Sequence, residues 1–193
     1  DRSSAASDVY KRQSHNVYLN DISPDGKKLL CSTSKPDITR CPFSLSSLFE
    51  IDLATLQADT LVAWDAYLGS ASYSPDGKQL LVTGSPSAFG GIGKNCGEHP
   101  IANDFDTQAF IMDLATKKVQ AITRDFNPTV SPVQWNRVDG CIYFDTTDGD
   151  CRHIYRYVPK TGGFEMLPLE EDVITSFTLA NDNPVVAAYV GGG

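Results

Sequence analysis

The sequence predicts an all-β protein, a partial β-propeller with about three and a half four-stranded antiparallel blades. Two observations support this fold. The pentapeptide Ser-Pro-Asp-Gly-Lys occurs at residues 23–27 and again at 74–78, each time between two short apolar runs. Residues 48–55 and 109–116 also resemble each other, and both segments end in Asp-Leu-Ala-Thr. A hairpin turn and a strand that recur together indicate repeated sheet units.

The repeated pentapeptide has the composition of a hairpin turn. Proline fixes φ, serine and aspartate form local hydrogen bonds, and glycine accepts the left-handed conformation that closes the turn. A more degenerate turn of this kind is expected in the third unit. The residues expected in these structural turns are Pro24, Asp25, Gly26, Pro75, Asp76, Gly77, Asp139 and Gly140.

The spacing of these turns is nearly constant. The closing threonine of one unit precedes the aspartate of the next turn by 21, 23 and 21 residues, in the pairs Thr55–Asp76, Thr116–Asp139 and Thr161–Asp182. The link between the second and third strands varies in length, whereas the other connections do not. This period favours a propeller over the structural alternatives, a β-sandwich or a barrel.

Apolar or alternating segments mark the expected strands in chain order. In the first two units they are residues 17–19, 28–32, 48–55 and 60–64, then 67–73, 79–83, 109–116 and 119–122. In the third unit and the start of a fourth they are residues 130–135, 141–144, 154–161 and 164–167, then 174–179 and 185–190.

The chain is divided accordingly into blades and one segment outside the fold. Residues 1–13 resemble the translation of a transposase adapter used in sequencing libraries, and we expect them to be a disordered artefact; a natural polar leader is the alternative. We expect the propeller to be truncated at both ends and poorly soluble alone, because its end blades lack neighbours. The expected units are residues 14–64, 65–124 with a long Gly-rich insertion at 84–106, 125–169, and a truncated blade at 170–193.

Composition excludes several classes of function. The formal net charge of −8 disfavours binding to nucleic acid or to an anionic membrane surface. No apolar run approaches the roughly 20 residues of a membrane helix, so no membrane insertion is expected. The five cysteines form no CxxC pair and no zinc-like cluster with histidine. The disulfide state therefore stays open, and neither a metal site nor a cofactor is expected.

Catalytic motifs are not recognisable. The segments at 69–73 and 84–88 lack the second glycine of a nucleophile elbow. The Gly-rich segment at 90–95 fails the phosphate-loop pattern, since Asn95 stands where Ser or Thr would bind magnesium. The three histidines suggest no catalytic triad, and a strand-end structural role is expected for His153. No catalytic residue is therefore assigned.

The Gly-rich insertion is the one irregular segment with functional promise. Long loops on rigid scaffolds often contact ligands. A gating or substrate-contact role is one interpretation, and a passive insertion is the other. The candidate residues for such a loop are Phe89, Lys94, Glu98, His99 and Phe105.

The repeats resemble those of known propeller families. The Ser-Pro-Asp-Gly-Lys turns, paired with third strands such as Phe-Ile-Met-Asp-Leu-Ala-Thr, are similar to the repeats of TolB-like proteins and of the prolyl oligopeptidase family. The third unit resembles the propeller of bacterial dipeptidyl-peptidase-like and acylaminoacyl-peptidase-like enzymes. That resemblance rests on residues 125–130, 133–135, 142–144 and 151–156.

The peptidase resemblance implies a particular function. In that family the propeller precedes an α/β-hydrolase domain with a Ser, Asp and His triad, and it restricts which peptides reach that triad. This chain would then be a non-catalytic fragment whose partners are the peptide substrate and the missing hydrolase domain, and a periplasmic or exported location is implied by analogy. The alternatives are a TolB-like propeller for protein–protein interaction and a propeller lyase acting on sugars.

Overall fold

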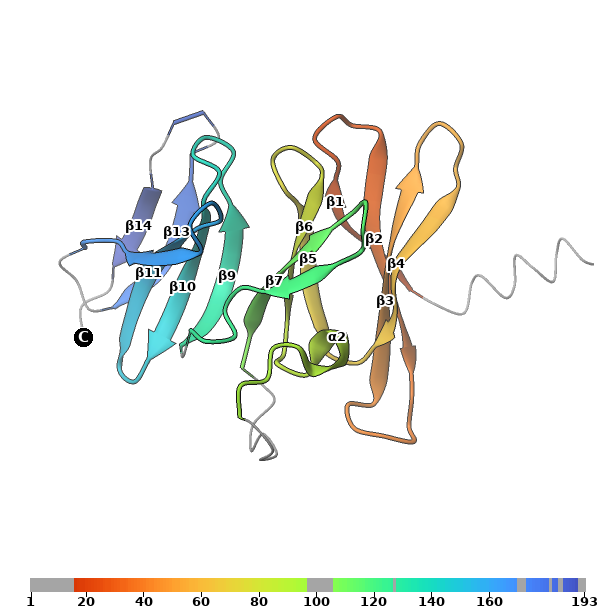
Figure 1. The fold of residues 1–193 in the computed structure, drawn as a ribbon, viewed down its shortest axis with the longest axis horizontal. Coiled ribbons are helices and arrows are strands. Elements are labelled where there is room, and N and C mark those ends of the chain that lie inside the picture. The colour runs from red at the N-terminus through yellow and green to blue at the C-terminus, as the bar shows by residue number, and fades with distance from the viewer. Residues whose placement is uncertain are drawn as a thin grey trace, which may run out of the picture.

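The computed structural model shows a row of twisted antiparallel β-sheets, packed side by side in chain order (Figure 1). The described residues form fourteen strands and one short helix. Three sheets have four strands and the last has two, which confirms the predicted partial β-propeller. The structure describes residues 16–96, 106–126, 128–169, 173–180, 182–183 and 186–190.

The first two blades each place their four strands in chain order, so hairpin connections join neighbouring strands. The first blade contains β1 (Val17–Ile22), β2 (Lys28–Pro36), β3 (Ser44–Asp52) and β4 (Ala58–Asp65). The second blade contains β5 (Leu68–Tyr73), β6 (Gln79–Gly84), β7 (Gln108–Asp113) and β8 (Val119–Ala121).

The third blade has the same order, and a hairpin of a fourth unit follows it. The third blade contains β9 (Thr129–Trp135), β10 (Ile142–Asp148), β11 (Cys151–Val158) and β12 (Gly163–Met166). The hairpin pairs β13 (Ile174–Leu179) with β14 (Val186–Val190).

The core lies between the blades, and the middle blade is buried on both faces. Leu80 packs with Leu30 of the first blade, whereas Leu81 packs with Phe144 of the third. Successive side chains of a strand point to opposite faces of its sheet. The two consecutive leucines of β6 therefore pack into two separate core layers. This explains why the middle of the strand is a continuous apolar run.

The two Ser-Pro-Asp-Gly-Lys segments form the same turn between the first and second strands of their blades. In the first copy the Gly26 amide donates to the Ser23 carbonyl at 2.8 Å, and the Ser23 hydroxyl donates to Asp25 at 2.7 Å. The second copy repeats both bonds, from Gly77 to Ser74 at 2.9 Å and from Ser74 to Asp76 at 2.7 Å. Both glycines have φ near +70°.

The turn of the third blade begins at an asparagine that the sequence analysis did not identify. The Asn136 amide donates to the Cys141 carbonyl at 2.8 Å, and the Gly140 amide donates to the Asn136 carbonyl at 3.2 Å. Gly140 has φ of +71°, as in the other two turns. Asp139 accepts the Cys141 amide at 2.9 Å. Asn136 thus occupies the position that serine holds in the first two copies.

The first two turns touch each other across the blade interface. A Cβ placed on Gly77 would lie 3.2 Å from Cδ of Pro24, whereas a Cβ on Gly26 would meet nothing within 4 Å. We expect Gly26→Ala to lower the free energy of unfolding by about 1–2 kcal/mol, because alanine disfavours positive φ. Gly77→Ala should cost about 1 kcal/mol more, since Pro24 must also shift. Urea denaturation of the two variants measures this difference, and equal losses would contradict the turn–turn contact.

A second repeated turn joins the third and fourth strands of the first two blades. Asp52 accepts the Thr55 amide at 2.8 Å, and Asp113 accepts the Thr116 hydroxyl at 2.7 Å and amide at 2.8 Å. The Thr55 amide and hydroxyl lower the pKa of Asp52, and the Thr116 hydroxyl and amide lower the pKa of Asp113. The ionised carboxylates therefore hold these turns closed.

These lowered pKa values predict acid sensitivity. The bonds to Asp113 contribute stability above the unfolded pKa near 4, and this contribution is lost as the pH falls through the lower folded pKa. We expect Asp113→Asn to reduce the change in unfolding free energy between about pH 6 and pH 2.5. Urea denaturation at several pH values tests this, with Asp148→Asn, an exposed strand-end residue, as the control. An unchanged pH profile for Asp113→Asn would contradict the assignment.

The structure also bears on membrane-spanning helices and on the cysteines. No helix in the described part of the chain has the length and hydrophobicity needed to cross a membrane. All five cysteines lie in the described ranges, and no disulfide joins any of them. Burial raises the pKa of the Cys31 and Cys141 thiols.

Candidate functional site

The connection between β6 and β7 holds the residues expected to gate access. Of the five candidates in this connection, Glu98, His99 and Phe105 lie outside the described residues. Phe89 and Lys94 are described, and they lie in different surroundings. Both lie in the part of the connection that follows β6 directly.

Phe89 lies in α2 (Ala88–Gly91), a short helical segment inside a connection that the sequence analysis predicted as a loop. Its ring meets the ring of Phe110, a core residue of β7, edge-on at 5.1 Å. Lys94 is exposed beyond the helix and its side chain runs along Gly91. The structure thus anchors Phe89 against the second blade and leaves Lys94 at the surface.

Side-chain amides hold the described part of this connection in place. Gln108 donates from Nε2 to the Gly93 carbonyl at 3.0 Å. Asn95 donates from Nδ2 to the Arg124 carbonyl at 2.9 Å, which links the connection to the end of the second blade. The connection is thereby fastened to its own blade on both sides of Lys94's position in the chain.

A groove of about 270 Å³ lies beside α2. It forms where the β2–β3, β4–β5 and β6–β7 connections of the first two blades meet, at the lower end of the blades in Figure 1. We call this hollow the corner groove. Its charged and aromatic lining residues are Arg40, Trp64, Asp65, Tyr67 and Phe89.

One carboxylate fixes two walls of the corner groove. Asp65 accepts the Tyr67 amide on Oδ1 at 2.8 Å and the Phe89 amide on Oδ2 at 2.7 Å. Tyr67 starts the second blade, whereas Phe89 follows 24 residues after Asp65. Hydrogen bonds from amides to an ionised carboxylate are among the stronger ones in proteins. Asp65 therefore acts as a clamp between two connections.

Two groove residues have a left-handed backbone. Trp64 has φ of +51° and Phe89 has φ of +54°, although neither is glycine. Such conformations cost roughly 1–2 kcal/mol each for an L-residue and persist only where surrounding contacts impose them. The Asp65 clamp lies directly between them and supplies such contacts. Residues held in this way cluster at ligand sites.

Charged side chains of both signs lie around the corner groove. Arg40 lies on its rim and forms an ion pair from Nε to Asp37 at 3.0 Å. The Thr39 hydroxyl and amide, followed by Arg40, lower the pKa of Asp37. Lys35 places its ammonium 4.0 Å from the ring centroid of Trp64. Two cations therefore lie close to the groove, while the carboxylate of Asp65 is occupied by two amides.

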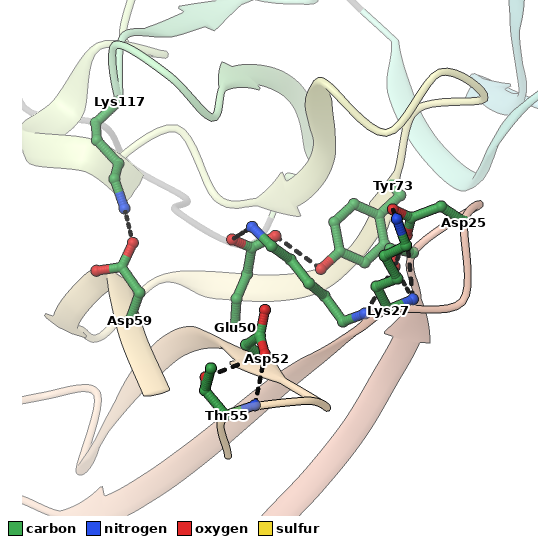
Figure 2. A network of polar contacts seen from close by, with 10 residues as sticks. Asp25, Lys27, Glu50, Asp52, Thr55, Asp59, Tyr73 and Lys117 are labelled. Atoms are coloured by element: carbon green, nitrogen blue, oxygen red, sulfur yellow. Dashed lines mark hydrogen bonds and ion pairs between the residues drawn. The ribbon is translucent and has the colours of Figure 1, made fainter. Parts of the chain in front are cut away.

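A separate polar network lies at the opposite end of the same blades, and Figure 2 shows it. Glu50 is only 5% exposed and accepts the Tyr73 hydroxyl at 2.8 Å and the Lys28 ammonium at 3.0 Å. Burial, followed by Glu50, raises the pKa of Tyr73. Because Glu50 and Tyr73 belong to different blades, this network joins the two sheets. A hollow of about 450 Å³ next to it is lined mainly by the two repeated turns.

A weaker ion pair crosses the same interface. The Lys117 ammonium of the second blade lies 2.8 Å from the Asp59 carboxylate of the first, and both side chains are exposed (Figure 2). Surface pairs of this kind contribute little to stability. The interface therefore depends on the buried Glu50 network more than on this contact.

The third blade contains a partly buried ion pair that was not expected from the sequence. Asp145 is 1% exposed and pairs with Arg152 on the neighbouring strand. Burial raises the pKa of Asp145, while the bond to Arg152 opposes this shift. His153, the one histidine among the described residues, accepts the Thr146 hydroxyl with its backbone carbonyl at 3.1 Å. This cluster holds β10 to β11 and lies outside the corner groove.

Glu50 could have been identified from the sequence, because it departs from the pattern of the repeat. Glu50 stands where the second unit has Ile111, so the sequence places a carboxylate at a core position of the repeat. Such a residue needs a partner from another blade, and Tyr73 supplies it. No comparable signal marks Trp64 or Asp65, which end an ordinary strand.

The corner groove is suited to binding and not to proton transfer, because two backbone amides occupy its carboxylate. Within the described ranges, no group of three or more His, Cys, Asp or Glu side chains is placed to hold a metal ion. The chemistry available in the groove is therefore contact with apolar or aromatic groups together with pairing to an anion.

Comparison with solved structures supports the propeller fold. TolB from Acinetobacter baumannii is 22% identical over 90% of this chain, with a TM-score of 0.60. An oligogalacturonate lyase from Vibrio parahaemolyticus is 16% identical over 88%, with a TM-score of 0.62. Pyrococcus horikoshii acylaminoacyl peptidase is 16% identical over 85%, with a TM-score of 0.52.

These likenesses establish the fold but not the function. No protein-family model matches the chain, and no curated protein matches it in sequence. The chain spans 37%, 46% and 26% of the three structures, so it corresponds to less than half of each. Its neighbours are propeller-containing proteins with different activities, and the chain itself is a partial β-propeller similar to theirs.

Proposed function

We propose that this chain is the non-catalytic propeller part of a serine peptidase and controls the access of peptides to an α/β-hydrolase domain. The observation that carries the proposal is the corner groove, a hollow lined by aromatic side chains whose connections are clamped by Asp65. Rigid scaffolds commonly present ligand contacts on the connections at one end. The likeness to the acylaminoacyl peptidase supports the proposal at the level of the fold.

In this proposal the blades are a rigid frame, and the groove contacts a peptide on its way to the catalytic domain. Folded proteins are too large to enter, whereas extended segments can lay single side chains into the hollow. The partners are thus the peptide substrate and the hydrolase domain of the parent chain. The location is periplasmic or exported, by analogy with bacterial peptidases of this kind.

The coding sequence downstream of residue 193 is the first test. We expect a Gly-x-Ser-x-Gly motif at a strand-to-helix turn after the last blade. The longer protein should react with a fluorophosphonate probe at that serine. A stop codon after about six blades, with no hydrolase domain, contradicts the proposal.

Gating is tested in the full-length enzyme with a matched pair of variants in β4. Asp65→Ala releases both clamped connections, whereas Asp59→Ala removes an exposed carboxylate from the same strand. We expect Asp65→Ala to change the ratio of kcat/KM for long and short peptides at least about threefold, because the groove loses its shape. Asp59→Ala should leave that ratio unchanged. Equal ratios in both variants contradict a gating role for the groove.

A TolB-like interaction module is the second candidate function. The TolB structure covers 90% of this chain, and a protein segment can present one side chain to the groove as a peptide does. This candidate predicts a chain without a hydrolase domain that binds a folded partner through the same connections. The downstream coding sequence therefore separates the two candidates.

A further inference from the structure

We propose that the corner groove binds the carboxy-terminal residue of a peptide when that residue is aromatic. The inference rests on the proposed peptide-handling function and names the chemistry that this site recognises. The ring enters the hollow beside Trp64 and Phe89, and the terminal carboxylate pairs with the guanidinium of Arg40.

The size of the groove limits what it can hold. Its volume of about 270 Å³ is below the roughly 300–1,000 Å³ of pockets that enclose whole small molecules. One large side chain fills such a hollow. The ligand is therefore a single residue of a longer chain, whose remainder stays outside.

The walls of the groove suit an aromatic side chain. The Trp64 ring has Lys35 over one face at 4.0 Å, and the Phe89 ring rests edge-on against the buried Phe110 ring at 5.1 Å. Each of the two rings is thus held by a neighbouring side chain. A further ring in the hollow can adopt the offset or edge-to-face geometries that aromatic groups prefer.

The charges of the groove suit a carboxylate next to that ring. Asp65 already binds the Tyr67 and Phe89 amides with both oxygens. Arg40 uses Nε for Asp37, and a guanidinium has five N–H donors in a planar fork that matches a carboxylate. Because the chain carries a net charge of −8, a bound carboxylate needs a local cationic partner such as this guanidinium.

A carboxy-terminal aromatic residue combines the two required groups, a ring and a carboxylate. Its ring and its carboxylate both belong to one residue, whereas an internal residue has a neutral amide in place of the carboxylate. The hollow holds one residue, so both groups must come from the same one. A chain terminus therefore fits the groove better than an acidic side chain elsewhere in the peptide.

The groove is also formed before a ligand arrives. Trp64 and Phe89 have left-handed backbones in the structure, and Asp65 holds the segments that carry them. A site that is ordered in advance loses less entropy on binding. The free energy that these two backbone conformations cost is therefore part of folding, and ligand binding does not have to supply it.

Calorimetric titration of the 193-residue chain tests the inference with three peptides. They are acetyl-Ala-Ser-Phe with a free carboxylate, the same peptide with a terminal amide, and acetyl-Ala-Ser-Ala with a free carboxylate. We expect the first to bind about tenfold more tightly than either of the others, since each control lacks one recognised group. Arg40→Gln should abolish the preference for the carboxylate and leave the preference for the ring.

Arg124→Gln is the matched control, because Arg124 is an exposed arginine paired with a neighbouring aspartate outside the groove. Circular dichroism verifies that each variant is folded, and Arg40→Met, which also removes the charge, replaces Arg40→Gln if that variant does not fold. Equal binding of the acid and amide peptides overturns the inference. So does equal weakening by the two Arg→Gln variants, and so does the absence of binding by all three peptides.

These outcomes separate the inference from the proposed function. Carboxylate-dependent and ring-dependent binding without a downstream hydrolase domain supports the groove and contradicts the peptidase. A hydrolase domain together with peptides that bind equally as acid and amide supports the peptidase and contradicts the inference.

Discussion

Phe110→Ala is expected to lower the free energy of unfolding by about 3–5 kcal/mol. Phe110 is 0% exposed in β7, within the core layer between the first and second blades. Removing its ring leaves a cavity and also removes the edge contact that supports Phe89. Urea denaturation followed by circular dichroism measures the loss. Peptide binding in the corner groove should weaken in the same variant.

Phe43→Ala is the control for this prediction. Phe43 lies in the β2–β3 connection and is 65% exposed, so the same chemical change removes almost no buried surface. We expect a loss below about 0.5 kcal/mol for this variant. A comparable loss for Phe43→Ala and Phe110→Ala would show that the core is not where the structure places it.

Tyr73→Phe is expected to lower the free energy of unfolding by about 1–3 kcal/mol. The change keeps the ring but leaves Oε1 of the buried Glu50 without its hydroxyl donor. Lys28 continues to bind the other carboxylate oxygen. Tyr18→Phe, at an exposed position of β1, should have almost no effect and serves as the control.

A double-mutant cycle connects this loss to the blade interface. In the cycle with Glu50→Gln, we expect a coupling energy of about 0.5–3 kcal/mol, because the two side chains contact each other directly. Additive losses would show that the Tyr73 hydroxyl stabilises the protein by another route. The cycle thus measures how strongly one blade holds the next.

The blades could be predicted because their determinants are local. Proline, aspartate and glycine encode the turn through their own backbone preferences and short hydrogen bonds, so Pro24, Asp25 and Gly26 are readable without any tertiary contact. Apolar strands between such turns then define the sheets. Asn136 was missed because the backbone bonds that define the turn do not require serine. Asparagine takes the place of serine there, and its Oδ1 accepts the Val138 amide.

The corner groove could not be predicted as a site, because its parts meet only in three dimensions. Phe89 was selected from the sequence as part of a long connection, but its amide donates to Asp65, which lies 24 residues earlier. Trp64 has no sequence feature that indicates a left-handed backbone, which the tertiary structure imposes. Arg40 comes from a third connection. Local patterns therefore identify the blades, while the groove arises from their packing.

The Asp65 clamp also affects how the first two blades unfold. The first blade supplies the carboxylate, whereas the two bound amides belong to the start of the second blade and to its long connection. In repeat proteins, strong contacts between neighbours make adjacent units unfold together. Hydrogen exchange at Tyr67 and Phe89 should consequently require separation of the two blades. The first two blades then form one cooperative unit, and the groove exists only while that unit is intact.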